Sequence, residues 1–323
     1  MAVALLRLLA KRFLIAVPLI FAVVTLTFVL IRLAPGDPAY ILAGDAPSEE
    51  FLAQVRHTYG LDQSMWNQYI AFLSKAVFGD FGTSIFYKKP VFEIILDRFP
   101  ATLLLTCASM TVASVLGVAF GVLAASRPGS RTDTGITVLS LVGYSIPTFW
   151  IGQLLILAFT LQFKWLPGGG MVSPRRNYEG LAWWSDVALH LILPAAAMAL
   201  FLLTMIARFT RTAMVDALGR DFVTVAKAKG ASERRVLWAH AFRVAVTTTI
   251  TVMGLEFGAV LVGAVLVETI FSWPGVGRLF YDAISKRDFP LLTGSFIFTA
   301  VIVVMVNALT DIACAALDPR LRK

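Results

Sequence analysis

The chain has 323 residues, of which 58% are hydrophobic, with a mean hydropathy of +0.78 and a formal net charge of +8. This composition excludes an ordinary soluble domain and favours a protein of the lipid bilayer. No basic patch with interleaved aromatic residues accompanies the positive charge, so nucleic-acid binding is not indicated.

Several apolar runs are long enough to cross a bilayer as helices. They predict an all-α membrane protein with six transmembrane helices, near residues 13–31, 101–125, 136–161, 189–206, 246–267 and 291–316. Lysine and arginine are concentrated in a basic arm at 1–12, in the 126–135 and 207–245 loops and in a tail at 317–323. The positive-inside rule therefore predicts that both termini and these loops are cytoplasmic.

The first and second apolar runs are separated by a sizeable polar insertion, residues 32–100. It contains short amphipathic stretches and the turn-rich sequence GDFGTS at 79–84. A segment of this size buries little apolar surface on its own. We therefore expect a small extracytoplasmic subdomain that rests on the outer ends of the helices.

Four residues stand out in the middle helices. Gly117 and Gly121 form a GxxxG pair, a spacing that allows two helix backbones to approach closely. Pro147 removes a backbone donor from the third run and predicts a broken helix, which marks either a transport pathway or a static kink. His190 begins the fourth run, where a solvated or capping side chain is expected.

A polar, basic stretch at 221–243 separates the fourth and fifth runs. Its apolar spacing predicts a short helix from Asp221 to Lys229, ended by Gly230 in a left-handed conformation. Ser232 is expected to cap the next helix, with Glu233 placing a negative charge in its first turn. The predicted product is a helix–Gly–helix elbow at the membrane surface, to which another protein could bind.

The fifth run contains one carboxylate well inside the apolar sequence, Glu256, with Gly254 and Gly258 on either side. Acidic side chains are costly in the bilayer and usually face water or the interior of a helix bundle. Two interpretations stay open. Glu256 lines a substrate pathway, or it accepts hydrogen bonds from a neighbouring helix.

Motifs along nearly the whole chain resemble those of the dipeptide/oligopeptide/nickel permeases of ABC importers. They are RLAPGDPA at 32–39, GDFGTSI at 79–85, YSIPTFW at 144–150, LPGGG at 166–170 and ETIFSWPGVGRLF at 268–280. The elbow is similar to the EAAxxxG loop of these permeases. Aligned on Gly230, only Ala226 of the first three positions matches, since Thr224 and Val225 replace the other two. The longer string AKAKGASERRVLWAHAFR is similar to the form found in the peptide group.

The resemblance implies a permease of the six-helix ABC-importer type in a bacterial inner membrane, with a five-helix core at 101–316. It implies half of a translocation pathway for peptides or a related solute, a second similar permease, two cytoplasmic ATPases and an extracytoplasmic solute-binding protein. The residues implied in ATPase coupling are Asp221, Thr224, Ala226, Ala228, Gly230, Ser232, Glu233, Arg234 and Arg235. The motifs do not distinguish dipeptide, oligopeptide, nickel and glutathione carriers.

The chain lacks the common catalytic and nucleotide-binding motifs. No GxxxxGK[ST], HExxH, GxSxG or EF-hand sequence occurs, and the three histidines are scattered. We therefore predict no catalytic, cofactor-binding or metal-binding residues in this chain, and ATP bound by the partner ATPases. The alternative to a permease subunit is a secondary transporter or channel that works alone, although the chain shows no internal repeat typical of that class.

Overall fold

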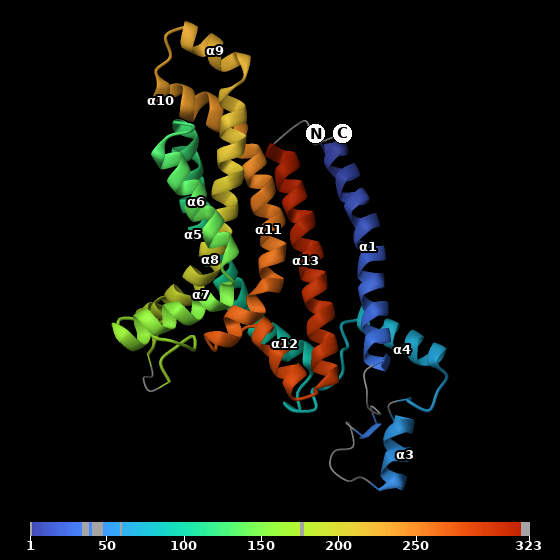
Figure 1. The fold of residues 1–323 in the computed structure, drawn as a ribbon. Helices are drawn as coiled ribbons and strands as arrows, with labels where there is room; N and C mark the ends of the chain where they lie inside the picture. The colour runs from blue at the N-terminus through green and yellow to red at the C-terminus, as the bar shows by residue number, and fades with distance from the viewer. Residues whose placement is uncertain (1, 34–38, 41–47, 59, 175–177, 318–323) are drawn as a thin grey trace. The chain divides into compact units, whose positions relative to one another are not determined.

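The computed structural model describes residues 2–33, 39–40, 48–58, 60–174 and 178–317 (Figure 1). This part of the chain is almost entirely helical, and its only β pairing is an isolated bridge between Thr83 and Pro90. The prediction of an all-α fold is confirmed. The chain divides into two compact units, the first made of Met1–Ala10, Ala101–Arg278 and Met305–Lys323 and the second of Lys11–Pro100 and Leu279–Val304.

The helices differ widely in length, from three residues in α10 to 39 in α8. In chain order they are α1 (Ala2–Leu33), α3 (Glu49–Thr58), α4 (Met65–Val77), α5 (Val91–Ser126), α6 (Arg131–Ser145), α7 (Thr148–Leu155), the π-helix η1 (Ile156–Gln162), α8 (Gly180–Leu218), α9 (Asp221–Ala228), α10 (Glu233–Arg235), the π-helix η2 (Val236–Ala241), α11 (Phe242–Ile270), α12 (Val276–Ser285) and α13 (Phe289–Leu317). The predicted basic arm at 1–12 is thus continuous with the first predicted span, because both lie in α1.

Five helical stretches are long and apolar enough to cross a membrane: Leu14–Leu33, Val91–Ser126, Gly180–Leu218, Glu233–Ile270 and Phe289–Ile312. The remaining predicted span, 136–161, is a pair of helices that meet at an angle of 97°. Pro147 is the N-cap of the second helix of this pair, where its missing N–H costs least. The predicted break is therefore present, and counting the bent pair as one span gives the six that were predicted.

In the first unit, α8 forms the centre. Fifty-six per cent of its most apolar window is buried, against 28% for the stretch that contains α11. α6, α7 and α11 pack against it. α5 also lies close to it, since a Cβ atom added at Gly117 or Gly121 would approach the carbonyl oxygen of Leu203 or Ala207 to 3.0 or 2.7 Å. The predicted close approach at the GxxxG pair is confirmed.

In the second unit, aromatic and polar contacts replace a large core. Phe28 of α1 packs against Tyr69 and Phe72 of α4, with ring centroids 5.3 and 5.5 Å apart. The buried carboxylate of Asp288 accepts hydrogen bonds from the Ser84 hydroxyl at 2.5 Å and the Phe86 amide at 3.0 Å. The polar insertion predicted at 32–100 falls in the same unit as Leu279–Val304.

Candidate functional site

The elbow begins with α9, which ends as its sequence predicts. Lys229 is the C-cap, and Gly230 follows with φ of +81°. The Ala231 amide donates to the Ala226 carbonyl at 3.1 Å, which closes the last turn of the helix. An L-residue is disfavoured at this φ, so glycine is required by the backbone and not by crowding, because nothing lies within 4 Å of the site of a Cβ atom.

The second arm of the elbow begins at Ser232. Its hydroxyl accepts a hydrogen bond from the Arg235 amide at 3.4 Å, which makes it the predicted N-cap. The α-helix that follows lasts only from Glu233 to Arg235 before the chain continues as η2. π-Helices are rare and often mark functional segments, and this one joins the elbow directly to α11.

A small apolar cluster closes the elbow from inside. It consists of the buried side chains of Val223, Ala226 and Val236. Of the residues implied in coupling, Ala226 is therefore a packing residue, and the other eight are exposed. In Figure 1, α9 and α10 lie together at one end of the first unit, beyond the ends of α6 and α11. A shallow hollow on this surface is lined by Ser232, Arg234, Arg235 and Trp238.

The other end of α11 contains a fully buried carboxylate, Glu268, that the sequence analysis did not single out. It accepts a hydrogen bond from the Thr102 hydroxyl at 2.7 Å and from the Arg278 amide at 3.0 Å. Thr102 in turn accepts from the Val276 amide at 2.8 Å. Glu268 thus ties the end of α11 to α5 and to the first turn of α12.

Two of the motifs quoted above, LPGGG and ETIFSWPGVGRLF, meet at Phe271 beside Glu268, together with α7, which begins within YSIPTFW. A Cβ atom at Gly152, just after YSIPTFW, would lie 3.0 Å from the ring of Phe271. Gly169 of LPGGG would likewise approach the Phe271 carbonyl to 3.0 Å, and the Gly170 amide donates to that carbonyl at 2.8 Å. These motifs therefore build one packed turn. The sequence signal for it was an acidic residue near the end of an apolar run, followed by Trp-Pro-Gly.

Glu256 lies midway between these two ends of α11. It is half-buried, and it makes no hydrogen bond or ion pair with the part of the chain that the structure describes. The predicted close neighbour is present at Gly254, where an added Cβ atom would overlap the side chain of Thr310. Glu256 thus has no hydrogen-bonding helix partner among the described residues, and its two interpretations now concern a pathway or another subunit.

The sequence analysis did not predict two further buried polar pairs, one formed by His190 and Asp186 and one by Asp133 and Arg211. His190 is buried, with Nδ1 2.8 Å from the Asp186 carbonyl oxygen, so the prediction of a solvated or capping histidine was wrong. The reason is that α8 begins nine residues earlier than the predicted run at 189–206, at Gly180. Asp133 of α6 is also buried and accepts two hydrogen bonds from Arg211 of α8, at 2.5 and 2.7 Å. Among the described residues, no group of three His, Cys, Asp or Glu could hold a metal ion.

Comparison with known proteins gives matches along nearly the whole chain. Residues 117–323 match the family described as binding-protein-dependent transport system inner membrane component, and residues 5–106 match its N-terminal part. The chain is 39% identical over 328 residues to the di/tripeptide transport system permease protein DppB of Pseudomonas aeruginosa, covering 97% of this chain and 98% of that protein.

Other relatives carry different names. The chain is 39% identical over 312 residues to the oligopeptide transport system permease protein AppB of Bacillus subtilis, covering 96% of this chain and 98% of that protein. It is 36% identical to the glutathione transport system permease protein GsiC of Escherichia coli, with 97% of each chain covered. A crystal structure of an amino acid ABC transporter with histidines is similar in fold, with a TM-score of 0.50 and 16% identity over 71% of this chain and 94% of that one.

Proposed function

The chain belongs to the family of binding-protein-dependent transport system inner membrane components, and from this membership we propose that its elbow couples the membrane helices to ATP hydrolysis in separate subunits. It is a multi-pass permease subunit of an ATP-driven importer and not an enzyme. The family assignment favours this function over a transporter that works alone.

We further propose the composition of the complete transporter. Two cytoplasmic ATPases, a second permease and an extracytoplasmic solute-binding protein assemble with this chain, and the ATPases bind the nucleotide. Both termini and the elbow lie in the cytoplasm. The solute is a small peptide, because two of the most similar relatives are named for the transport of di/tripeptides and oligopeptides.

The observation that carries the coupling proposal is the form of the elbow. It is closed internally by its own apolar cluster and helix caps, and it exposes charged side chains at one end of the first unit (Figure 1). A surface of this kind keeps its shape without a partner and therefore suits insertion into a groove of an ATPase. Closure of that groove would move α8 and α11, the helices that the elbow joins.

The substitution Gly230→Val tests the coupling proposal. Valine is strained at a φ of +81°, by about 1–2 kcal/mol or more, so the two arms should lose their angle. ATP hydrolysis stimulated by the loaded binding protein should fall at least about fivefold in reconstituted vesicles, with unchanged membrane insertion, since a strain of about 1 kcal/mol corresponds to about that factor.

Gly129→Val is the matched control. Gly129 has φ of +78° and open space around it, but it lies in the other cytoplasmic loop. It should therefore lose similar stability and keep stimulated hydrolysis. Equal hydrolysis in wild type and Gly230→Val, or an equal loss in both variants, would contradict coupling through the elbow.

A further inference from the structure

In the first unit, α6 and α8 line a cavity of about 130 Å³ that none of the functions above uses. We propose that this cavity binds the phosphate group of a phospholipid whose headgroup carries no amine, such as phosphatidylglycerol. The site goes beyond the proposed function, because it depends on the membrane helices of this chain and not on the solute or the ATPases.

The cavity lies where α6 and α8 run side by side in opposite directions. On one side of it, Arg211 of α8 donates a hydrogen bond to Asp133 of α6 at 2.7 Å. On the other side, a Cβ atom added at Gly143 of α6 would lie 2.7 Å from the side chain of Thr204. These contacts hold the two helices together beyond both ends of the cavity, and Arg208 lies between them on α8.

Arg208 is a cation that is not neutralised within the described part of the chain. Its guanidinium carbon lies 5.7 Å from the centre of the Tyr144 ring and 5.5 Å from that of Phe209, and it forms no ion pair with a described residue. Arg211, one turn later, is by contrast paired with Asp133. An aromatic ring leaves the N–H groups of a guanidinium free to donate. Arg208 can therefore bind an anion from outside the chain.

The other polar groups of the cavity also suit an anion. The hydroxyls of Ser140 and Tyr144 line it, and neither makes a hydrogen bond with a described residue. Both can donate beside the guanidinium, and no acidic side chain is among the described residues that line the cavity. Hydrogen bonds from such donors to a charged acceptor are stronger than those between neutral groups.

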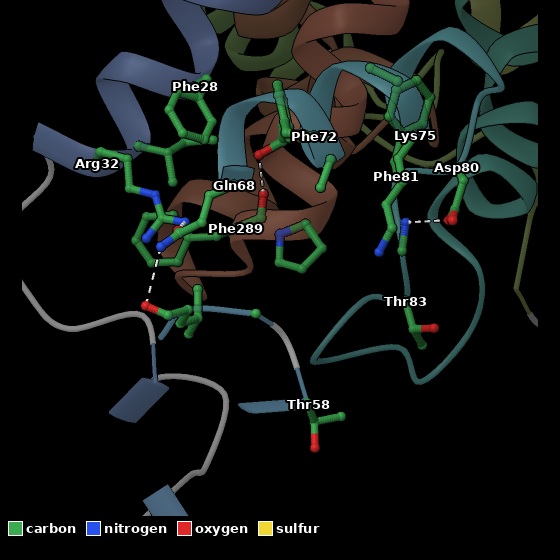
Figure 2. A pocket seen from close by; sticks show the side chains of 18 of the residues that line it. Phe28, Arg32, Thr58, Gln68, Phe72, Lys75, Asp80, Phe81, Thr83 and Phe289 are labelled. Atoms are coloured by element: carbon green, nitrogen blue, oxygen red, sulfur yellow. Dashed lines mark hydrogen bonds between the residues drawn. The ribbon is translucent and has the colours of Figure 1, made fainter. Parts of the chain in front are cut away.

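The cavity of the second unit differs in both respects. Its arginine, Arg32, donates a hydrogen bond to the side-chain oxygen of Gln68, and a carboxylate, Asp80, also lines it, as Figure 2 shows. A cavity with charges of both signs and an arginine that is already bonded does not select an anion. The charged residues that line the cavity between α6 and α8 are both arginines, Arg208 and Arg211.

The position of Arg208 along its helix indicates a lipid phosphate. Arg208 follows the apolar run 189–206 by two residues, and the cavity also includes Ile136, the first residue of the apolar run 136–161. At such positions a membrane helix leaves the hydrocarbon region and meets the lipid headgroups. Leu141 lines the cavity and is 63% exposed, so the cavity opens onto an apolar surface that an acyl chain can cover.

A phospholipid without an amine fits this cavity better than a peptide. A zwitterionic peptide needs an acceptor for its ammonium group, and the lining described above supplies no carboxylate. The same argument disfavours phosphatidylethanolamine. The volume agrees, because sites that enclose a whole small molecule measure about 300–1,000 Å³, whereas this cavity has room only for part of a larger ligand.

The test measures lipid binding to the full-length chain, purified together with the subunits that assemble with it. The delipidated complex is titrated in non-ionic detergent with phosphatidylglycerol, and the Kd of each binding step is measured by native mass spectrometry. Arg208→Gln removes the cation and should weaken the tightest step about tenfold or more. Tyr144→Phe removes only a hydroxyl and should weaken it severalfold. Phosphatidylethanolamine should bind wild type at least severalfold more weakly than phosphatidylglycerol.

Arg131→Gln is the matched control, because Arg131 is an exposed arginine at the start of α6 and does not line the cavity. Its Kd should equal that of wild type. Equal Kd values for wild type and Arg208→Gln would overturn the proposal, as would equal affinity for the two lipids. Competition by the dipeptide Ala-Phe would overturn it in favour of a solute site.

The same titration of the isolated chain distinguishes a lipid site from a subunit contact. The step that depends on Arg208 should be present both in the isolated chain and in the complex. If the isolated chain showed this step and the complex did not, the cavity would be covered by another subunit, and the lipid site would be refuted.

Discussion

The two ends of α11 are built in different ways. Its first end continues from the elbow, where hydrogen bonds join residues a few positions apart, as between Ser232 and Arg235. Its last end is held by Glu268, whose bond to Thr102 joins residues 166 positions apart. The polar groups of the elbow are exposed, whereas Glu268 is fully buried.

This difference distinguishes the elbow, an exposed segment that can bind a partner, from the support, by which we mean Glu268 and the helices that its hydrogen bonds hold together. A locally stabilised, exposed segment can bind a partner without losing its own structure, because few of its contacts lie outside it. A buried carboxylate with donors from α5 and α12 keeps three helices in one arrangement. Substitutions at the last end should therefore reduce stability, and those at the first end should reduce coupling.

The largest effect is expected for Glu268→Leu. It leaves the Thr102 hydroxyl and the Arg278 amide without their acceptor, and each unsatisfied buried donor costs about 1–3 kcal/mol. The free energy of unfolding in detergent should fall by about 2–6 kcal/mol. The same change at the elbow, Glu233→Leu, should cost less than about 1 kcal/mol because Glu233 is exposed. A similar loss of unfolding free energy in both variants would contradict the proposed difference between the two ends of α11.

An intermediate effect, on transport and not on stability, is expected for Glu256→Gln. Gln keeps the size and hydrogen-bonding capacity but removes the charge. If Glu256 lines the pathway, kcat/KM for zwitterionic or cationic solutes should fall about tenfold, with little change for neutral solutes and normal assembly. Uptake assays in vesicles measure this. Equal uptake of every solute, together with poor assembly of Glu256→Leu, would show that Glu256 contacts another subunit instead.

The smallest effect is expected for Ser232→Ala. Loss of an N-cap costs about 1 kcal/mol, and here the loss is confined to the elbow. Stimulated ATP hydrolysis should fall severalfold while the unfolding midpoint moves little. Ser130→Ala removes the equivalent cap of α6 and should leave hydrolysis unchanged. If Ser232→Ala instead destabilised the whole chain, the elbow would contribute to global stability in the way proposed for Glu268.

The features that could be predicted from the sequence are those that depend on neighbouring residues. Gly230 and Ser232 end and begin helices for reasons of local backbone geometry, and Pro147 breaks the third span because it lacks a donor. Apolar runs likewise predict spans without knowledge of their partners. The close approach at Gly117 and Gly121 was predictable because the spacing itself makes room.

The support around Glu268 could not be predicted in the same way. Its donors come from residues far apart in the sequence, and a run that contains a carboxylate does not show which helix will supply them. The Asp133–Arg211 pair, 78 positions apart, is a similar case. The packing of Ala226 is another such case, since the family pattern implies a coupling residue and does not show that its side chain is buried.

The hydrogen bond between Ser84 and Asp288 has a consequence for biosynthesis. The two residues are 204 positions apart. Ribosomes add about 5–20 residues per second, so about 10–40 s separate their appearance. During that interval the turn at Ser84 has already been made and lacks its acceptor. The second unit is therefore completed late, when the last helix emerges, although most of its residues come from the first third of the chain.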